Sequence, residues 1–175
     1  ANISKFKKPD FWEGFSLSEN NFIVLTLHRP ANVDNPQKLR SYLNTIIDCS
    51  KQMPVIFPVH PRTASKLEAI TLNYTNLYLV DPMGYLEFNY LVSFAKCVIT
   101  DSGGIQEEAP ALGKPVLVMR NTTERPEAVI AGTVRLVGTS RKTIVGEVFK
   151  LLDNSAEYEL MSKSANPFGC GDSAK

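Results

Sequence analysis

The fold of this chain is decided by the stretch Ile99-Thr100-Asp101-Ser102-Gly103-Gly104-Ile105-Gln106-Glu107-Glu108-Ala109-Pro110. The apolar run that enters it, 97–99, predicts a buried strand, and the residues after Gly104 follow a helical pattern. Glycines let a backbone turn tightly and let a ligand approach its amides, and a helix begins with N–H groups that lack partners. The stretch therefore predicts a strand, a glycine turn and a helix, which together form an anion site suited to phosphate.

The two glycines also have a simpler interpretation, in which they only make the turn between a strand and a helix. Their motif is neither a Walker loop nor the G-x-G-x-x-G fingerprint of dinucleotide sites. Glu108, one helical turn after Gly104, favours the binding interpretation, because a carboxylate can accept hydrogen bonds from both hydroxyls of a ribose. A phosphate site beside such a carboxylate describes a nucleotide site.

Length and composition limit the class of protein. The chain has 175 residues, of which 43% are hydrophobic and 21% charged, as is usual for one globular domain. The net charge of +1 gives no electrostatic reason to expect nucleic acid as a partner. No apolar run approaches the roughly 20 residues of a membrane span, and no charged-then-apolar leader is present. We expect a cytoplasmic protein that binds neither nucleic acid nor membrane.

Cysteine and histidine are too few to suggest a disulfide framework or a metal site. Cys49, Cys97 and Cys170 are odd in number and far apart, which predicts reduced thiols. Only two histidines are present, which argues against a histidine-based metal site. We therefore expect neither a metal nor a cofactor.

Short apolar strands alternate with helices along most of the chain. The expected strands are residues 22–27, 55–59, 77–80, 97–100, 116–119 and 134–137, and the expected helices are 35–51, 63–70, 85–95, 105–112, 127–131, 143–152 and 156–163. Six strands separated by helices predict βαβ units and a parallel sheet covered on both faces. Right-handed crossovers make this a doubly wound, Rossmann-like α/β sheet, whose ligands bind beyond the carboxyl ends of the strands.

The ends of the chain differ in character from its middle. We expect residues 1–20 to form a linker or docking segment, 21–165 the Rossmann-like domain, and 166–175 a truncated C-terminal tail. The chain begins at Ala1 rather than Met, and its last residues are rich in Gly, Ser and Asn. We expect it to be a piece of a larger protein.

Several polar residues follow strands, at the edge of the sheet where a ligand is expected. His28 and Arg29 follow the first strand, and His60 follows the second. A histidine near a phosphate is held partly protonated and can stabilise a leaving group, so His28 is a candidate catalytic residue. For His60 both a ligand role and a structural role stay open.

Arg125 and Phe88 are two further candidates with structural alternatives. Arg125 follows the fifth strand and can donate a fork of hydrogen bonds to phosphate, although an ion pair with Glu124 or Glu127 would explain it equally. Phe88 lies on the expected helix 85–95, where most such residues belong to the core. Its functional interpretation is stacking on a base.

These motifs resemble the C-terminal half of the non-hydrolysing UDP-N-acetylglucosamine 2-epimerases. The resemblance rests on Thr100–Pro110, Leu-Gly-Lys-Pro-Val-Leu-Val-Met-Arg at 112–120, Thr-Thr-Glu-Arg-Pro-Glu at 122–127, Ala-Gly-Thr at 131–133, the two histidine loops at 25–29 and 59–61, and Asn-Pro-Phe-Gly at 166–169. It covers nearly the whole chain, but only about the second half of a full-length family member.

The resemblance implies a two-domain glycosyltransferase-B architecture with the active site between two Rossmann-like domains, of which this chain is the UDP-binding one. The family interconverts UDP-GlcNAc and UDP-ManNAc through anti elimination of UDP to a 2-acetamidoglucal and syn re-addition. The resemblance assigns a role in the departure of UDP to His28. It also assigns UDP binding to Ser102, Gly103, Gly104, Glu108, Arg125, Phe88 and Met83, of which the last two are expected at the uracil.

The chain departs from the family after His28-Arg29, where it has Pro30-Ala31 and relatives often carry Arg-Glu. Some members bind a second UDP-GlcNAc near this loop and near the residue that matches His60, so Arg29 and His60 are possible regulatory residues. The acid/base carboxylates belong to the family's N-terminal domain, which is outside this sequence. The resemblance therefore implies a homodimeric parent epimerase that feeds polysaccharide synthesis, and a chain that is inactive alone.

Three alternatives stay open beside the epimerase. Two are enzymes: a hydrolysing 2-epimerase and a UDP-sugar glycosyltransferase of similar fold. The third is a non-catalytic nucleotide-sugar binding module.

Overall fold

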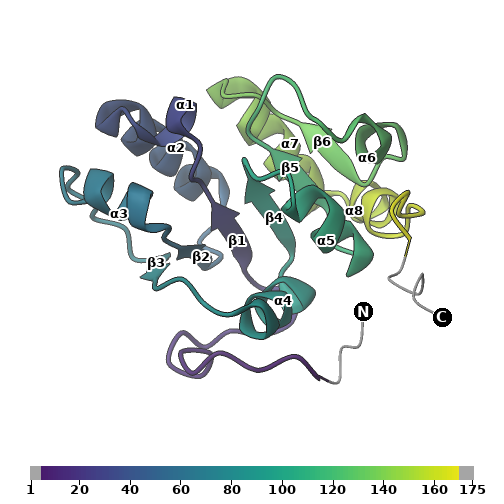
Figure 1. Cartoon of the computed structure of the whole chain (residues 1–175), viewed down its shortest axis with the longest axis horizontal. Helices are drawn as coiled ribbons and strands as arrows, with labels where there is room; N and C mark the ends of the chain where they lie inside the picture. The colour runs from purple at the N-terminus through teal and green to yellow at the C-terminus, as the bar shows by residue number, and fades with distance from the viewer. Residues whose placement is uncertain (1–4, 170–175) are drawn as a thin grey trace.

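Six parallel strands form one sheet in a computed structural model that describes residues 5–169 (Figure 1). Their order is β3-β2-β1-β4-β5-β6, which confirms the predicted doubly wound sheet. The strands are β1 (Ile23–Thr26), β2 (Val55–Pro58), β3 (Leu77–Val80), β4 (Cys97–Thr100), β5 (Val116–Val118) and β6 (Val134–Leu136). All are short and lie within the stretches that the sequence predicts, and all are mostly apolar, although β6 includes Arg135.

Eight helices lie between and after these strands in the described part of the chain. They are α1 (Pro30–Val33), α2 (Pro36–Cys49), α3 (Pro61–Leu67), α4 (Tyr85–Phe94), α5 (Ile105–Ala111), α6 (Pro126–Ile130), α7 (Arg141–Asp153) and α8 (Ser155–Ser162). Asn35 begins α2 by accepting a hydrogen bond from the amide of Lys38 at 2.9 Å. Prolines occupy the first turn of α2 and α6, where their missing N–H costs nothing.

The core has two layers because alternate strand residues point to opposite faces of the sheet. In β1, Ile23 and Leu25 pack with the core under α2, α3 and α7, whereas Val24 packs with the core under α4, α5 and α6. All three side chains are fully buried. Figure 1 shows the helices covering the sheet on both sides.

The segment before β1 packs onto the second of these cores. Trp12 and Leu17 are buried, and the Trp12 ring makes edge contacts with Phe22, Tyr90 and Phe94. In Figure 1 this purple segment runs beneath α4. Residues 5–20 are therefore tied to the domain by a buried aromatic cluster.

The strand order reverses between β1 and β4, which lie side by side at the centre of the sheet. β1 is followed in sequence by β2 on one side, whereas β4 is followed by β5 on the other. Their pairing is in register from Ile23 opposite Cys97 to Thr26 opposite Thr100. Such a reversal opens a crevice at the carboxyl ends of the two strands, where doubly wound proteins bind ligands.

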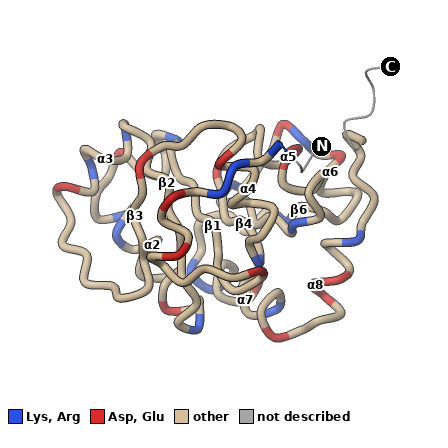
Figure 2. Tube along the Cα trace, turned by 90° about the horizontal axis from the view of Figure 1, so that it is seen from below, with Lys and Arg blue, Asp and Glu red and all other residues tan. Residues whose placement is uncertain are grey.

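Charges of both signs are interspersed around the fold (Figure 2), in keeping with the net charge of +1. Among residues 5–169, no helix is both long enough and apolar enough to cross a membrane. Cys49 and Cys97 are buried free thiols, and burial raises their pKa to about 11 and about 12 respectively. Cys170 lies outside the described residues.

Candidate active site

A cavity of about 360 Å³ lies at the carboxyl ends of β1, β2 and β4. It brings together five of the residues that the sequence singles out, namely His28, His60, Met83, Phe88 and Ser102. Apolar side chains of Pro82, Met83 and Phe88 line one part of it, and the two histidines and Ser102 supply polar groups. This mixture suits a ligand with a flat ring at one end and a charged group at the other.

Ser102, Gly103 and Gly104 form the loop between β4 and α5. Thr100 Oγ1 accepts a hydrogen bond from the Ser102 amide at 2.9 Å, and it also shares one with Thr26 Oγ1 at 2.6 Å. The amides of Gly103, Gly104 and Ile105 donate to no atom of the described residues, and neither does the Ser102 hydroxyl. These groups are therefore free to bind an anion.

The glycines serve this loop differently from the expectation that they allow a tight turn. Gly104 has φ −63° and ψ −39°, a conformation open to any residue, and Gly103 also lacks a positive φ. A Cβ on Gly104 would meet nothing within 4 Å, and one on Gly103 only Glu124 Oε2 at 3.9 Å. Their lack of a side chain keeps the space above the loop empty, which is what the approach of a ligand needs.

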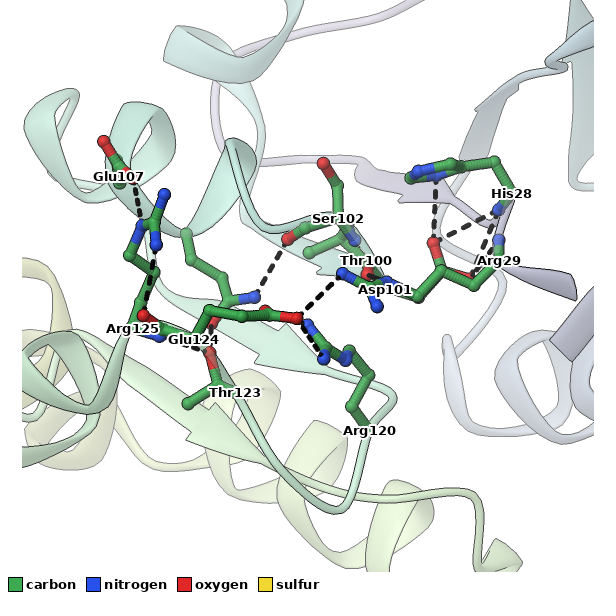
Figure 3. A network of polar contacts seen from close by, with 11 residues as sticks. His28, Arg29, Thr100, Asp101, Ser102, Glu107, Arg120, Thr123, Glu124 and Arg125 are labelled. Carbon is green, nitrogen blue, oxygen red and sulfur yellow. Dashed lines mark hydrogen bonds and ion pairs between the residues drawn. The ribbon is translucent and has the colours of Figure 1, made fainter. Parts of the chain in front are cut away.

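Asp101 is a completely buried carboxylate directly beneath His28 (Figure 3). Its Oδ1 lies 3.0 Å from Nδ1 of the His28 ring. Its carboxylate oxygens also accept hydrogen bonds from the backbone amides of His28 at 3.1 Å and Arg29 at 3.0 Å. Asn32 Nδ2 adds a further hydrogen bond at 3.1 Å. Asp101 thus fixes the loop after β1 to the end of β4.

The charge state of Asp101 follows from these contacts. Burial alone would raise the pKa of its carboxyl, but the hydrogen bonds from His28, Arg29 and Asn32 outweigh burial and hold the pKa below its ordinary value. Asp101 is therefore an anion in the folded chain. Because a carboxylate only accepts hydrogen bonds, every group that faces it is a donor.

Glu108 lies on α5, outside the cavity lining, and its carboxylate makes no hydrogen bond to the described residues. Partial burial, reinforced by the charge of Glu107, raises the pKa of the Glu108 carboxyl. Both of its oxygens are available to accept hydrogen bonds. This is compatible with the predicted ribose role, which remains a prediction.

Three arginines lie around the loops after β4 and β5 and are held by carboxylates (Figure 3). Arg125 pairs with Glu107 on α5 rather than with Glu124 or Glu127, the partners in the structural alternative. Arg120 donates to Glu124 at 2.7 Å and lowers the pKa of the Glu124 carboxyl to about 2. Arg125 does not line the cavity, so its predicted contact with phosphate remains a prediction.

Arg29 is the third of these arginines, and it also lies outside the cavity lining. Its Nε donates to the Asp101 carbonyl at 2.8 Å, and its Nη2 lies 3.4 Å from Glu124 Oε1. Arg29 therefore helps to join the loops that follow β1, β4 and β5.

His60 has a structural role in the described part of the chain, and it also lies where a ligand role is predicted. Its Nδ1 accepts a hydrogen bond from the Arg62 amide at 3.2 Å and thereby caps α3. Its ring also lines the cavity, with its centroid 6.0 Å from that of His28. The cap gives His60 a structural function, and its place in the cavity leaves the ligand role possible.

Two buried residues of the site escaped sequence reasoning as functional candidates. Asp101 stands inside the deciding stretch, yet nothing in the pattern shows that its carboxylate turns under His28. Gln106 is fully buried and bonds to Ser102 O at 3.0 Å and to Thr123 Oγ1 at 2.5 Å. It joins the loop after β4 to the loop after β5. The available signal was a polar residue beside apolar ones: Asp101 directly follows the apolar strand β4, and Gln106 directly follows the apolar Ile105 in α5.

No group of three or more His, Cys, Asp or Glu side chains in residues 5–169 is arranged to hold a metal ion. What the site offers is free amides, hydroxyls, an imidazole and an apolar wall. Groups of these kinds suit a phosphorylated ligand that has a ring.

Comparison with known proteins identifies the relatives of this arrangement. The family model for UDP-N-acetylglucosamine 2-epimerase matches residues 2–175. The UDP-N-acetylglucosamine 2-epimerase of Campylobacter jejuni is 46% identical over 161 residues, which are 90% of this chain and 42% of that protein.

Two solved structures share the fold along most of the chain. The UDP-GlcNAc 2-epimerase of Methanocaldococcus jannaschii, in complex with UDP-GlcNAc and UDP, is 34% identical with a TM-score of 0.78, covering 93% of this chain and 45% of that one. The S. aureus MnaA–UDP structure is 31% identical with a TM-score of 0.79, over 93% and 45%. The chain spans less than half the length of these relatives. By its sequence along nearly its whole length and by its fold, the chain belongs to the UDP-N-acetylglucosamine 2-epimerase family.

Proposed function

We propose that this chain binds the UDP part of a UDP-sugar, and that the whole protein interconverts UDP-GlcNAc and UDP-ManNAc. The observation that carries the proposal is the cavity at the β1–β4 reversal, where His28 and Ser102 face an apolar wall that includes Met83 and Phe88. The M. jannaschii and S. aureus relatives, each solved with UDP, support it.

Each part of the site has a role in this proposal. The diphosphate binds the free amides and hydroxyl of the loop 102–105, the ribose binds Glu108, and the uracil packs on Met83 and Phe88. Arg125 leaves its ion pair with Glu107 and binds a phosphate oxygen instead. His28 donates to the oxygen on which negative charge develops when UDP departs, an interaction that is strongest in the transition state.

The remaining chemistry belongs to another part of the protein. Epimerisation needs a group that removes and returns the proton at C2 of the sugar. In this proposal an N-terminal domain supplies those acid/base groups and closes the cleft over the sugar. The parent enzyme acts as a homodimer in the cytoplasm, and the buried thiols of Cys49 and Cys97 agree with a reducing compartment.

Titration calorimetry of the 175-residue chain with UDP tests the binding half of the proposal. The sharpest variant is Gly104→Leu, because its side chain enters empty space and the backbone conformation suits any residue. We expect the free energy of unfolding to change by less than about 1 kcal/mol, while UDP binding is lost. Gly146→Ala, at another open helical position on α7, is the matched control and should bind UDP normally.

Glu108→Gln tests the ribose assignment separately. Loss of a hydrogen bond to a charged acceptor should weaken UDP binding about tenfold. Glu127→Gln, at an exposed glutamate whose carboxylate has no hydrogen-bond partner in residues 5–169, is the control. Unchanged affinity in Glu108→Gln would refute the ribose role, and normal binding by Gly104→Leu would refute the phosphate loop.

A further inference from the structure

The contact between His28 and Asp101 restricts which ring nitrogen of His28 carries a proton. Nδ1 lies 3.0 Å from a carboxylate oxygen that has no solvent exposure. An acceptor-only group at this distance requires a hydrogen on Nδ1. The neutral ring then has its lone pair on Nε2, on the ring edge that is left for the cavity.

The surroundings of Asp101 make this arrangement hard to reverse. Its Oδ2 accepts from the Arg29 amide at 3.0 Å and from Asn32 Nδ2 at 3.1 Å, and Asn32 is itself fixed to the Met119 carbonyl at 3.2 Å. These donors come from the loop after β1 and from α1, and Asn32 is held in place by the residue that follows β5. The carboxylate cannot rotate away from His28 without leaving several buried donors without a partner.

We propose that Asp101 is a positioning residue, which holds the His28 ring with Nδ1–H toward the carboxylate and Nε2 toward the cavity. In this state Nε2 takes up a proton from solvent when a phosphate oxygen arrives and shares it in a charge-assisted hydrogen bond, while Nδ1 keeps its hydrogen bond to Asp101. The tautomer follows from the structure alone, whereas the contact with phosphate rests on the proposed function.

His60 is an internal reference for the NMR experiment, because its ring is expected to have the opposite tautomer to that of His28. Its Nδ1 accepts a hydrogen bond from the Arg62 amide at 3.2 Å, so its proton is on Nε2. The sequence contains only these two histidines. A sample labelled with ¹⁵N-histidine therefore gives two ring systems, one of each tautomer, and His60→Asn identifies which signals belong to which residue.

The substitution Asp101→Asn reverses the chemistry at one atom. In the wild type, Oδ2 of Asp101 accepts hydrogen bonds from Arg29 and Asn32, so the side-chain oxygen of the new asparagine is best placed at that position. The NH₂ group of the asparagine then takes the position of Oδ1, which faces His28. Nδ1 of His28 must then accept, and the proton moves to Nε2. Asn32→Ala is the matched control, since it removes one partner of the same carboxylate but leaves the contact with His28.

The experiment is long-range ¹H–¹⁵N correlation NMR at alkaline pH, where imidazoles are neutral. We expect His28 to have its proton on Nδ1 in the wild type and in Asn32→Ala, and on Nε2 in Asp101→Asn. The wild-type spectrum alone overturns the proposal if His28 has its proton on Nε2, even if Asp101→Asn does not fold. An unchanged tautomer in a folded Asp101→Asn would also overturn it.

The same spectra with saturating UDP test the functional part. Both His28 nitrogens should be protonated in the wild-type complex, but only Nε2 in Asp101→Asn, whose UDP affinity should be about five- to tenfold weaker. Equal affinity with an altered tautomer would show that Asp101 does not position His28 for the ligand. Absence of UDP binding in the wild type would instead refute the proposed function, and the tautomers of the free chain would still decide the role of Asp101.

Discussion

At the scale of single residues, the site depends on a few side chains that come from different strand ends. His28 follows β1, His60 follows β2 and Ser102 follows β4, and all three face one cavity. Most of the support beneath them comes from buried polar groups such as Asp101 and Gln106. The exposed groups can therefore bind a ligand without giving up the bonds that hold their loops.

The first residue-scale prediction concerns His28→Ala in the full-length enzyme. If His28 stabilises charge on departing UDP, kcat should fall about ten- to a thousandfold with a smaller change in KM. Steady-state kinetics beside a thermal melt of the same variant measures both effects. A destabilised enzyme with normal turnover in its folded fraction would show that His28 only orders the turn at Arg29 and Pro30.

The location of a site residue is predictable from sequence where its position relative to a strand is informative, and it is not predictable where it depends on the direction of a side chain. His28 and Ser102 were predicted because they follow apolar runs, which places them at the ligand edge of a parallel sheet. Asp101 also follows such a run. Its burial under a histidine 73 residues earlier is set by the pairing of β1 with β4, and no local pattern contains that information.

At the scale of elements, the strands and most helices were predictable because their apolar periodicity is strong. The four-residue helix α1 was not predicted, since Pro-Ala-Asn-Val is too short to show a period. The packing of the segment before β1 was also not specified. Its contacts are with Tyr90 and Phe94 on α4, far along the chain.

The element-scale prediction follows from that packing. Trp12→Ala should lower the free energy of unfolding by about 3 kcal/mol, because it empties a buried aromatic site on the second core. Ile130→Ala, at a side chain that is 86% exposed on α6, should change it by less than about 0.5 kcal/mol. Urea denaturation of both variants is the measurement, and equal effects would mean that residues 5–20 do not belong to the cooperative unit.

At the scale of the whole molecule, the pH dependence of stability should contain a contribution from Asp101. Its pKa in the folded chain is below the ordinary value of 3.8. The stabilisation is therefore complete above that value and is lost as the pH falls through the lower, folded pKa. Asp34, Glu87, Glu124, Glu147 and Glu159 also have lowered pKa values, so the wild type must be compared with Asp101→Asn, in which these groups are unchanged.

Urea unfolding between about pH 6 and about pH 2 gives this comparison. The wild type should be more stable by about 2 kcal/mol at neutral pH, and the difference should shrink in acid. If the free energy of unfolding falls equally in both proteins as the pH is lowered, the pKa of Asp101 is not lowered in the folded chain.

A second prediction at this scale is that the 175-residue chain does not epimerise UDP-GlcNAc on its own. In the proposed function the described residues bind UDP and assist its departure, but the mechanism also needs a base at C2 of the sugar. Product analysis after long incubation with UDP-GlcNAc is the measurement. Formation of UDP-ManNAc by the purified chain would show that this half contains the full machinery, whereas release of free ManNAc would favour the hydrolysing alternative.

The bond network of Asp101 has a consequence for the order in which the protein gains its structure and its ligand. The loops that it joins meet only after β1 has paired with β4, and the paired residues of these strands, such as Ile23 and Cys97, are 74 residues apart. Such distant pairings form slowly because closing the loop between the two segments costs chain entropy before their contacts can form. A ligand of this site would therefore find little to bind during refolding and would act by slowing unfolding, so that nucleotide protects the finished fold without speeding its formation.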